Sequence, residues 1–304
     1  MQMFNKSFLI EKIVNSLLSH DFQVLVSEGA FDIAAKKEFL MLIKALINID
    51  GLTKEQALSL KTISYFLSAY PLIISLKTNR EFLKKEIIYS RFNLPVVTPY
   101  FFEKFLEEEK IPEIEAIKGR HVVHIDTEAL RKRRKELCLT IEELSRLVGI
   151  TKKALYEIEN KKVNPSLETL RKLERILKVD LKSPFSLRPC ELTYLKPKNR
   201  FQEKVSKEFL RIGLINSPTY FAPFEIVGKE KFSMIVSLST NMKKIEKDAW
   251  YIKKMSFIFS SKCAFVAKEC DKKSVEEVPV ILESEIPEIG SVEELERLME
   301  EKVE

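Results

Sequence analysis

The sequence predicts a mixed α/β protein in which two similar α/β domains flank a central all-α domain. Strand-like and helix-like patterns alternate in the first and last thirds, and one segment of each third matches the other without gaps. The excess positive charge is confined to a short helical stretch between them. The 304 residues are 45 % hydrophobic, which is enough for several packed cores. We expect domains at 1–119, 120–182 and 201–304, with a proline-containing linker at 183–200.

The matching segments are residues 31–45, FDIAAKKEFLMLIKA, and residues 224–238, FEIVGKEKFSMIVSL. The elements around them also occur in the same order, so the last domain is predicted to be an internal duplicate of the first. Each copy should hold a first helix (Ser7–Leu18; Gln202–Ile212), a long helix (Thr53–Ala69; Met242–Ser260), two apolar strands (Leu72–Ser75 and Leu94–Val97; Ala264–Ala267 and Val278–Ile281) and an acidic closing helix (Phe102–Glu109; Val292–Glu301).

The central stretch carries clear helix signals at its start. Thr127 can cap a first helix that runs to Leu137. Thr140 and Glu143 have the spacing of a capping box, which begins a second, short helix. Gly149 then supplies the left-handed conformation that a tight turn between helices requires.

Two further helices complete the stretch. Thr151 caps the third helix, and Pro165-Ser166 starts a fourth with leucines at helical spacing. Two short helices joined by a glycine turn inside a small bundle form the helix-turn-helix arrangement. Five leucines are predicted to form the core of the bundle: Leu130, Leu137, Leu144, Leu155 and Leu170.

The charge distribution points to a nucleic acid partner. Residues 127–182 contain 15 Lys and Arg against 9 Asp and Glu, while the rest of the chain holds 36 of each sign. The net charge of +6 therefore lies entirely in this segment, as phosphate binding would require.

Residues 139–177 resemble the XRE (Cro/lambda-repressor) helix-turn-helix family. The likeness rests on the helix spacing, the turn Gly149, the pair Ile158-Glu159 and the run from Pro165 to Leu170. It implies that residues 152–160 form a recognition helix in the major groove of double-stranded DNA.

The resemblance implies DNA contacts by specific side chains. Lys152 and Lys153 can donate to guanine, and Tyr156 can donate to a base or a phosphate. Thr151 would lie near a phosphate at a helix N-terminus, and Lys161 and Lys162 near backbone phosphates. Two further candidates are Thr140 and Arg134, the latter within a basic run (residues 131–135) that is either a phosphate contact or a solvated helix face.

Three positions depart from the family pattern. Ile141 stands where the family often has a glutamine that supports base contacts, and Lys161 stands where it usually has glycine. Glu157 places an acid on or near the expected DNA-facing surface. The base specificity of the family therefore does not carry over.

The flanking copies weakly resemble the PD-(D/E)xK nuclease fold. Asp32 and Lys44 have part of its spacing, but Leu42 occupies the position of the second metal-binding acid. In the second copy Glu225 matches Asp32, whereas Ile235 and Ser237 replace the remaining motif residues. We expect an inactive fold reused for dimerisation, DNA clamping or ligand sensing, and therefore no enzyme activity.

Other residues give weaker signals. His121 and His124 form the only histidine-rich spot, and without a third ligand in view we expect a short strand there rather than a metal site. The four cysteines lack zinc-site spacing and are expected to be reduced and mostly buried. No cofactor is expected, and no apolar run is long enough for a membrane span.

These observations favour an archaeal-type transcriptional regulator that is cytoplasmic and binds operator DNA as a homodimer, with an effector still to be identified. One alternative is a metal-dependent nuclease or DNA-repair protein targeted by the helix-turn-helix. Another is a protein-binding scaffold or antitoxin.

Overall fold

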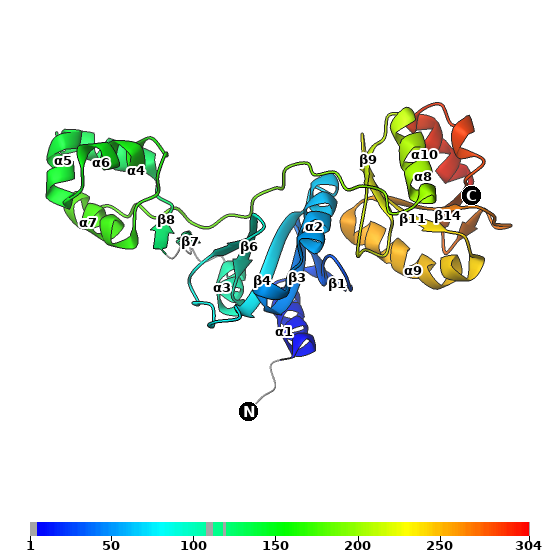
Figure 1. Cartoon of the computed structure of the whole chain (residues 1–304), viewed down its shortest axis with the longest axis horizontal. Helices are drawn as coiled ribbons and strands as arrows, with labels where there is room; N and C mark the ends of the chain where they lie inside the picture. Colours follow the sequence, from blue (N-terminus) through cyan, green and yellow to red (C-terminus); the bar gives the residue numbers. More distant parts are fainter. Residues whose placement is uncertain (1–4, 108–111, 118–119, 304) are drawn as a thin grey trace. The chain divides into compact units, whose positions relative to one another are not determined.

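The computed structural model describes residues 5–107, 112–117 and 120–303 (Figure 1). Its chain divides into two compact units, one formed by residues 1–73 with 188–304 and the other by residues 74–187. The predicted end of the first domain at Gly119 and the end of the predicted helix at Glu109 lie outside the described residues. No helix in the described ranges is long and apolar enough to cross a membrane.

The N-terminal copy contains a six-stranded sheet of order β1-β2-β3-β4-β6-β5. Its elements are α1 (Lys6–Leu18), β1 (Gln23–Val26), β2 (Ile33–Lys36), β3 (Leu40–Asn48), η1 (Ile49–Gly51), α2 (Lys54–Phe66), β4 (Tyr70–Lys77), β5 (Tyr89–Arg91), β6 (Leu94–Val97) and α3 (Pro99–Leu106).

The C-terminal copy has the equivalent sheet, of order β9-β10-β11-β12-β14-β13. Its elements are α8 (Arg200–Arg211), β9 (Ile215–Pro218), β10 (Ile226–Lys229), β11 (Ser233–Ser239), α9 (Met242–Phe259), β12 (Lys262–Ala267), β13 (Ser274–Val275), β14 (Val278–Leu282), η2 (Ile286–Glu288) and α10 (Val292–Glu301). Because both sheets have the same strand order, the prediction of two similar α/β domains is confirmed.

The strand pairing extends this equivalence to single residues. Ile33 pairs with Ile43 in the N-terminal copy, and the matching positions Ile226 and Val236 pair in the C-terminal copy. Strand register is set by which side chains must face the core, so matched apolar patterns produce matched registers.

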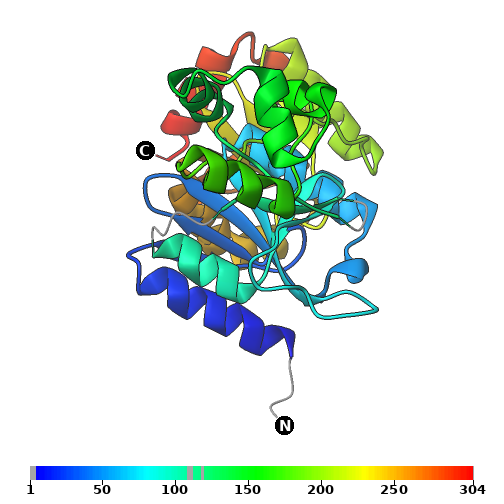
Figure 2. The same cartoon turned by 90° about the vertical axis from the view of Figure 1, so that its left-hand side faces the viewer.

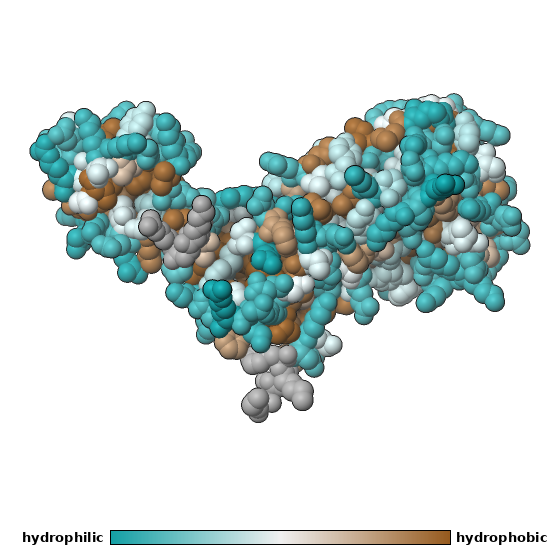
Figure 3. Space-filling model, in the orientation of Figure 1, coloured by the Kyte–Doolittle hydropathy of each residue, from teal (hydrophilic) through white to brown (hydrophobic). Residues whose placement is uncertain are grey.

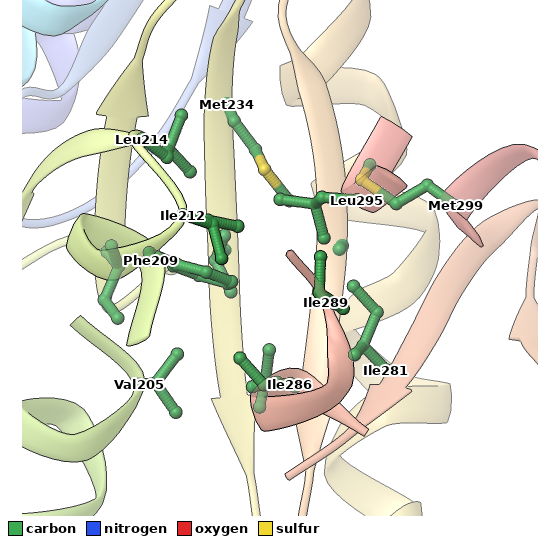
Figure 4. Packing of buried hydrophobic residues seen from close by; sticks show 14 of the residues in the cluster. Val205, Phe209, Ile212, Leu214, Met234, Ile281, Ile286, Ile289, Leu295 and Met299 are labelled. Atoms are coloured by element: carbon green, nitrogen blue, oxygen red, sulfur yellow. The ribbon is translucent and has the colours of Figure 1, made fainter. Parts of the chain in front are cut away.

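Aliphatic and aromatic side chains from helices and sheet fill the core of the C-terminal copy (Figure 4). Phe209 of α8 and Leu295 of α10 are fully buried against Met234 of β11 and Ile281 of β14. Each helix thus buries one apolar face on the sheet, as amphipathic helices do.

The two copies pack against each other within the first unit, and each contributes the equivalent helix to the contact. Helix α9 packs on β1 and β2 of the N-terminal copy, while its counterpart α2 packs on β10. The ring of Phe259 makes edge-to-face contacts with both Phe31 and Phe224, which are matching residues of the two copies. Such reciprocity is typical of an isologous interface, here formed inside one chain.

One glycine allows this close approach. The backbone N–H of Ala30 donates to the carbonyl oxygen of Phe221 at 2.5 Å. Gly29 has φ +128°, and a Cβ atom added there would lie 1.8 Å from the same oxygen. Only glycine fits at this position.

The second unit includes the hairpin β7 (Ile114–Ile117) and β8 (Arg120–Val123), followed by α4 (Thr127–Glu136), α5 (Ile141–Val148), α6 (Lys152–Glu159) and α7 (Leu167–Leu177). Figure 2 turns these four helices toward the viewer. Four of the five predicted core leucines are fully buried: Leu130, Leu144, Leu155 and Leu170.

Two details of this region differ from the predictions. Asp126 rather than Thr127 is the N-cap of α4, because its carboxylate accepts from the N–H groups of Glu128 and Ala129. Leu137 is 40 % exposed, since α4 ends at Glu136 and the next residue no longer continues the inner face.

The four cysteines are free, but they are less buried than predicted. Cys138 is exposed, and Cys190, Cys263 and Cys270 are half-buried. Burial raises the pKa of the Cys190 thiol to about 11.

Candidate nucleic-acid interface

The helices α5 and α6 are each capped at their N-termini and joined by a tight turn. The Thr140 hydroxyl accepts from the N–H of Glu143, whose carboxylate accepts in return from the Thr140 N–H at 2.8 Å. Gly149 has φ 79°, as the turn requires, and Thr151 caps α6 by accepting from the N–H of Ala154 at 3.1 Å. The local sequence therefore fixes where both helices begin and how the chain turns between them.

Helix α6 has an apolar inner face and a cationic outer face. Leu155 and Ile158 are buried in the core of the bundle. The side chains of Lys152 and Lys153 are 66 % and 84 % exposed, and Tyr156 is 49 % exposed. The exposed face is therefore the one that carries the predicted base-contacting residues, and hydrophilic residues also dominate the visible outline of this region in Figure 3.

Both outward lysines have acidic partners in the free protein. The Lys152 ammonium lies 3.5 Å from a Glu142 carboxylate oxygen, and the Lys153 ammonium 3.9 Å from Glu157. Hydrogen bonding from Arg146 and the charges of Arg146 and Lys152 lower the pKa of Glu142. The sequence pattern had indicated the acid at Glu157 but not the role of Glu142.

Lys161 and Lys162, which follow the C-cap residue Asn160 of α6, are also exposed. Lys161 has φ 58°, the left-handed conformation for which the family uses glycine. Its left-handed backbone ends the helix as glycine would, while its side chain is exposed. The Lys162 ammonium lies 5.8 Å from the centre of the Tyr156 ring, on the same face.

Arg134 does not belong to this surface. Its Nε donates to Glu159 Oε1 at 2.6 Å, and its Nη2 donates to Glu159 Oε2 at 3.0 Å. Its Nη1 donates to the carbonyl oxygen of Leu139 at 2.8 Å, and the residue is 9 % exposed. The structure therefore corrects the expectation of a phosphate contact: this arginine joins α4 to the end of α6.

The nuclease-like position Asp32 is buried and surrounded by cations. The ammonium groups of Lys6 and Lys44 lie 2.8 Å and 3.1 Å from Asp32 Oδ1. Leu42, at the place of the second acid, is fully buried. Burial lowers the pKa of Lys44, and the nearby Asp32 opposes that shift. The residues present do not fit a divalent metal, because two ammonium groups approach the one carboxylate and a buried leucine occupies the place of the second acid.

In both copies the second oxygen of the matching carboxylate accepts a hydrogen bond from a backbone N–H. Asp32 Oδ2 accepts from the N–H of Ala45 at 2.9 Å, and Glu225 Oε2 accepts from the N–H of Leu238 at 2.6 Å. Ala45 and Leu238 are matching positions of the duplication. Lys244 supplies the cation in the C-terminal copy, 2.9 Å from Glu225 Oε1.

Comparison with known proteins agrees with both regions. Residues 130–182 match the helix-turn-helix family model, and residues 6–111 match the model of the PD-(D/E)XK superfamily domain. A protein of Methanothermobacter thermautotrophicus named as an HTH-type transcriptional regulatory protein is 30 % identical, over 98 % of this chain and 97 % of its own. The chain belongs to this family of archaeal HTH-type transcriptional regulatory proteins.

Other members of the family match over most of their length. The protein of Archaeoglobus fulgidus is 27 % identical over 97 % of both chains, and that of Pyrococcus horikoshii is 29 % identical over 88 % of both. The predicted resemblances to the XRE-type helix-turn-helix and to the nuclease fold are thus confirmed. No solved structure matches the chain.

Proposed function

We propose that this family member recognises operator DNA in a sequence-specific manner as a homodimer, with α6 as the recognition helix. The observation that supports it most is the outer face of α6, where Lys152, Lys153 and Tyr156 project from a helix whose inner face is fixed in the core. A rigid helix with exposed donors is what reading base edges in the major groove requires.

The side chains divide into two classes of contact. Lys152, Lys153 and Tyr156 face base edges, whereas Lys161 and Lys162 contact phosphates beside the groove. The N-terminal N–H groups after Thr140 and Thr151 face phosphates as well, because helix N-termini favour anions. Arg134 is not among the proposed DNA contacts, because its guanidinium is bound to the buried Glu159 carboxylate.

The short length of the recognition helix α6 is the reason for proposing a dimer. Helix α6 has 8 residues, which at 1.5 Å per residue is about 12 Å and spans only a few base pairs. Two copies on a pseudo-palindrome double the number of bases read, with half-sites one or more helical turns apart.

The nuclease-like copies are proposed to be non-catalytic. Lys6 and Lys44 stand at the Asp32 carboxylate where an active site would hold a metal ion. A magnesium-dependent cleavage assay on duplex, nicked and branched DNA tests this directly. Cleavage by the wild type that Asp32→Ala abolishes would instead support the nuclease function.

Selection from a random duplex library with the purified full chain, at about 150 mM salt, tests the main proposal. We expect enrichment of a two-fold symmetric motif. Lys152→Ala should change the base preference at one position of each half-site, and the exposed Lys172 of α7 provides the matched control Lys172→Ala. Enrichment of no motif, or the same preference in both variants, would contradict the assignment of α6.

Removing the proposed phosphate contacts should change affinity and its salt dependence rather than base preference. Lys161→Ala and Lys162→Ala should weaken binding to all sequences alike and reduce the salt slope by about one each. An unchanged slope would remove these lysines from the interface.

A further inference from the structure

The β7–β8 hairpin, which precedes the helix-turn-helix, brings Glu113 and Glu115 next to His124. Glu113 and Glu115 are two residues apart and thus share one face. Val122 pairs with Glu115 across the hairpin, and His124 lies two residues beyond Val122 on that face. The His124 N–H donates to the Glu113 carbonyl oxygen at 2.9 Å, which fixes this register.

The side-chain atoms of the three residues converge on one point. His124 Nε2 lies 3.1 Å from Glu115 Oε2 and 4.0 Å from Glu113 Oε1. One donor atom from each residue lies within 4.8 Å of the others. Glu113 is only 4 % exposed, so its carboxylate is held mostly out of water.

A fourth side chain reaches the same nitrogen from the loop after the recognition helix. The amide group of Asn164 lies 3.1 Å from His124 Nε2. An amide N–H would require Nε2 to be unprotonated, whereas the Glu115 carboxylate at the same nitrogen would require a proton there. Rotation of the amide places its oxygen at Nε2, and the carboxylate oxygens, a neutral imidazole nitrogen and this amide oxygen are then all electron-pair donors that can surround a cation.

We propose that Glu113, Glu115 and His124, together with Asn164, form a binding site for a divalent first-row transition-metal ion. One imidazole with two carboxylates and an amide is a nitrogen and oxygen donor set. The imidazole favours Zn²⁺ or Co²⁺ over Mg²⁺ and Ca²⁺, which take oxygen ligands. The ligand distances need to shorten by the small side-chain movements that metal binding usually produces.

The position of the site gives the metal a mechanical role. The hairpin is joined to the loop between α6 and α7 by the Val123 N–H, which donates to the Pro165 carbonyl oxygen at 3.0 Å, and by a bridge between Val122 and Ser166. A metal ligated by both His124 and Asn164 would add a further link between the hairpin and that loop. It would thereby hold the end of the recognition helix more firmly.

The test uses the full chain without any affinity tag. We expect Co²⁺ to give a visible absorption band that saturates at one ion per chain. Zn²⁺ should displace the bound Co²⁺ and remove the band, whereas Mg²⁺ should not. His124→Ala and the isosteric Glu115→Gln should each weaken Zn²⁺ binding at least about tenfold in calorimetry. The matched control is His121→Ala, on the same hairpin three residues away.

The second measurement is hydrogen exchange in residues 160–166, which should slow on addition of Zn²⁺ in the wild type and in His121→Ala only. A wild-type protein that binds no ion at micromolar concentrations would overturn the proposal. Equal loss of binding in His121→Ala and His124→Ala would overturn it too, as would unaltered binding in Glu115→Gln. None of these readouts depends on DNA, so their failure leaves the operator-binding proposal standing.

Discussion

The ion pair between Arg134 and Glu159 is the interaction whose removal should most affect the recognition helix. The guanidinium makes three hydrogen bonds of 2.6, 3.0 and 2.8 Å, two to the carboxylate and one to the Leu139 carbonyl oxygen. The side chains of the pair are 10 % and 3 % exposed. Replacing Arg134 by methionine leaves the buried Glu159 carboxylate without its bidentate partner, while Arg131 Nε remains 4.0 Å from Glu159 Oε2. The cost should therefore be about 3 kcal/mol, the lower end of the range for breaking a buried pair.

Hydrogen exchange of the intact protein can measure the loss of stability in α6 itself. The only tryptophan, Trp250, lies in the other compact unit, so its fluorescence does not report on α6. Since about 1.4 kcal/mol corresponds to a factor of ten, Arg134→Met should speed exchange of the core amides in residues 152–160 by about two orders of magnitude.

Two further variants test whether the Arg134–Glu159 pair holds α6 in place. Arg146→Met removes an arginine that is 74 % exposed and paired with Glu142, and should change exchange less than about fivefold. The double variant Arg134→Met with Glu159→Leu removes both charges and should recover most of the lost protection. If Arg134→Met proved as mild as Arg146→Met, the pair would not hold α6 in place.

Three other perturbations test separate features. Gly29→Ala places a Cβ atom against the Phe221 carbonyl oxygen and should lower the free energy of unfolding by roughly 2–5 kcal/mol in denaturant titration; wild-type stability would contradict the close approach of the two copies. Glu142→Gln frees Lys152 and should raise affinity for random duplex about two- to fivefold at low salt in fluorescence anisotropy, whereas Glu168→Gln, which breaks a comparable exposed pair on α7, should have a smaller effect. Because the pKa of Cys190 is raised to about 11, this thiol should react with thiol reagents slowly at pH 8 and faster as the pH rises toward 11; rapid labelling at pH 8, read by mass spectrometry, would contradict its burial.

The fold could be predicted from the sequence where local patterns determine it. The gap-free match of residues 31–45 with 224–238 anticipated two sheets of identical strand order. The cap residues Thr140 and Thr151 and the turn Gly149 gave the helix-turn-helix its boundaries, because these residues act on backbone groups within one turn of themselves.

The site could be predicted only in part, because some of its residues depend on tertiary partners. Arg134 is one of five consecutive basic residues, and nothing local distinguishes it from its neighbours. Only the packing of α4 against α6 brings Glu159 to it. Likewise, Glu113 and His124 reveal their relation only once the register of the β7–β8 hairpin is known.

The matching acids Asp32 and Glu225 show what the duplicated fold has retained. In both copies one carboxylate oxygen accepts from the backbone N–H that follows the lysine position of the nuclease motif. The cation at the other oxygen comes from different places, from Lys6 and Lys44 in one copy and from Lys244 in the other. A metal-binding role would require the second acid, which is Leu42 in one copy and Ile235 in the other, both fully buried. The shared feature is thus the hydrogen bond that ties the start of one strand to the next strand, and this bond stabilises the hairpin in both copies.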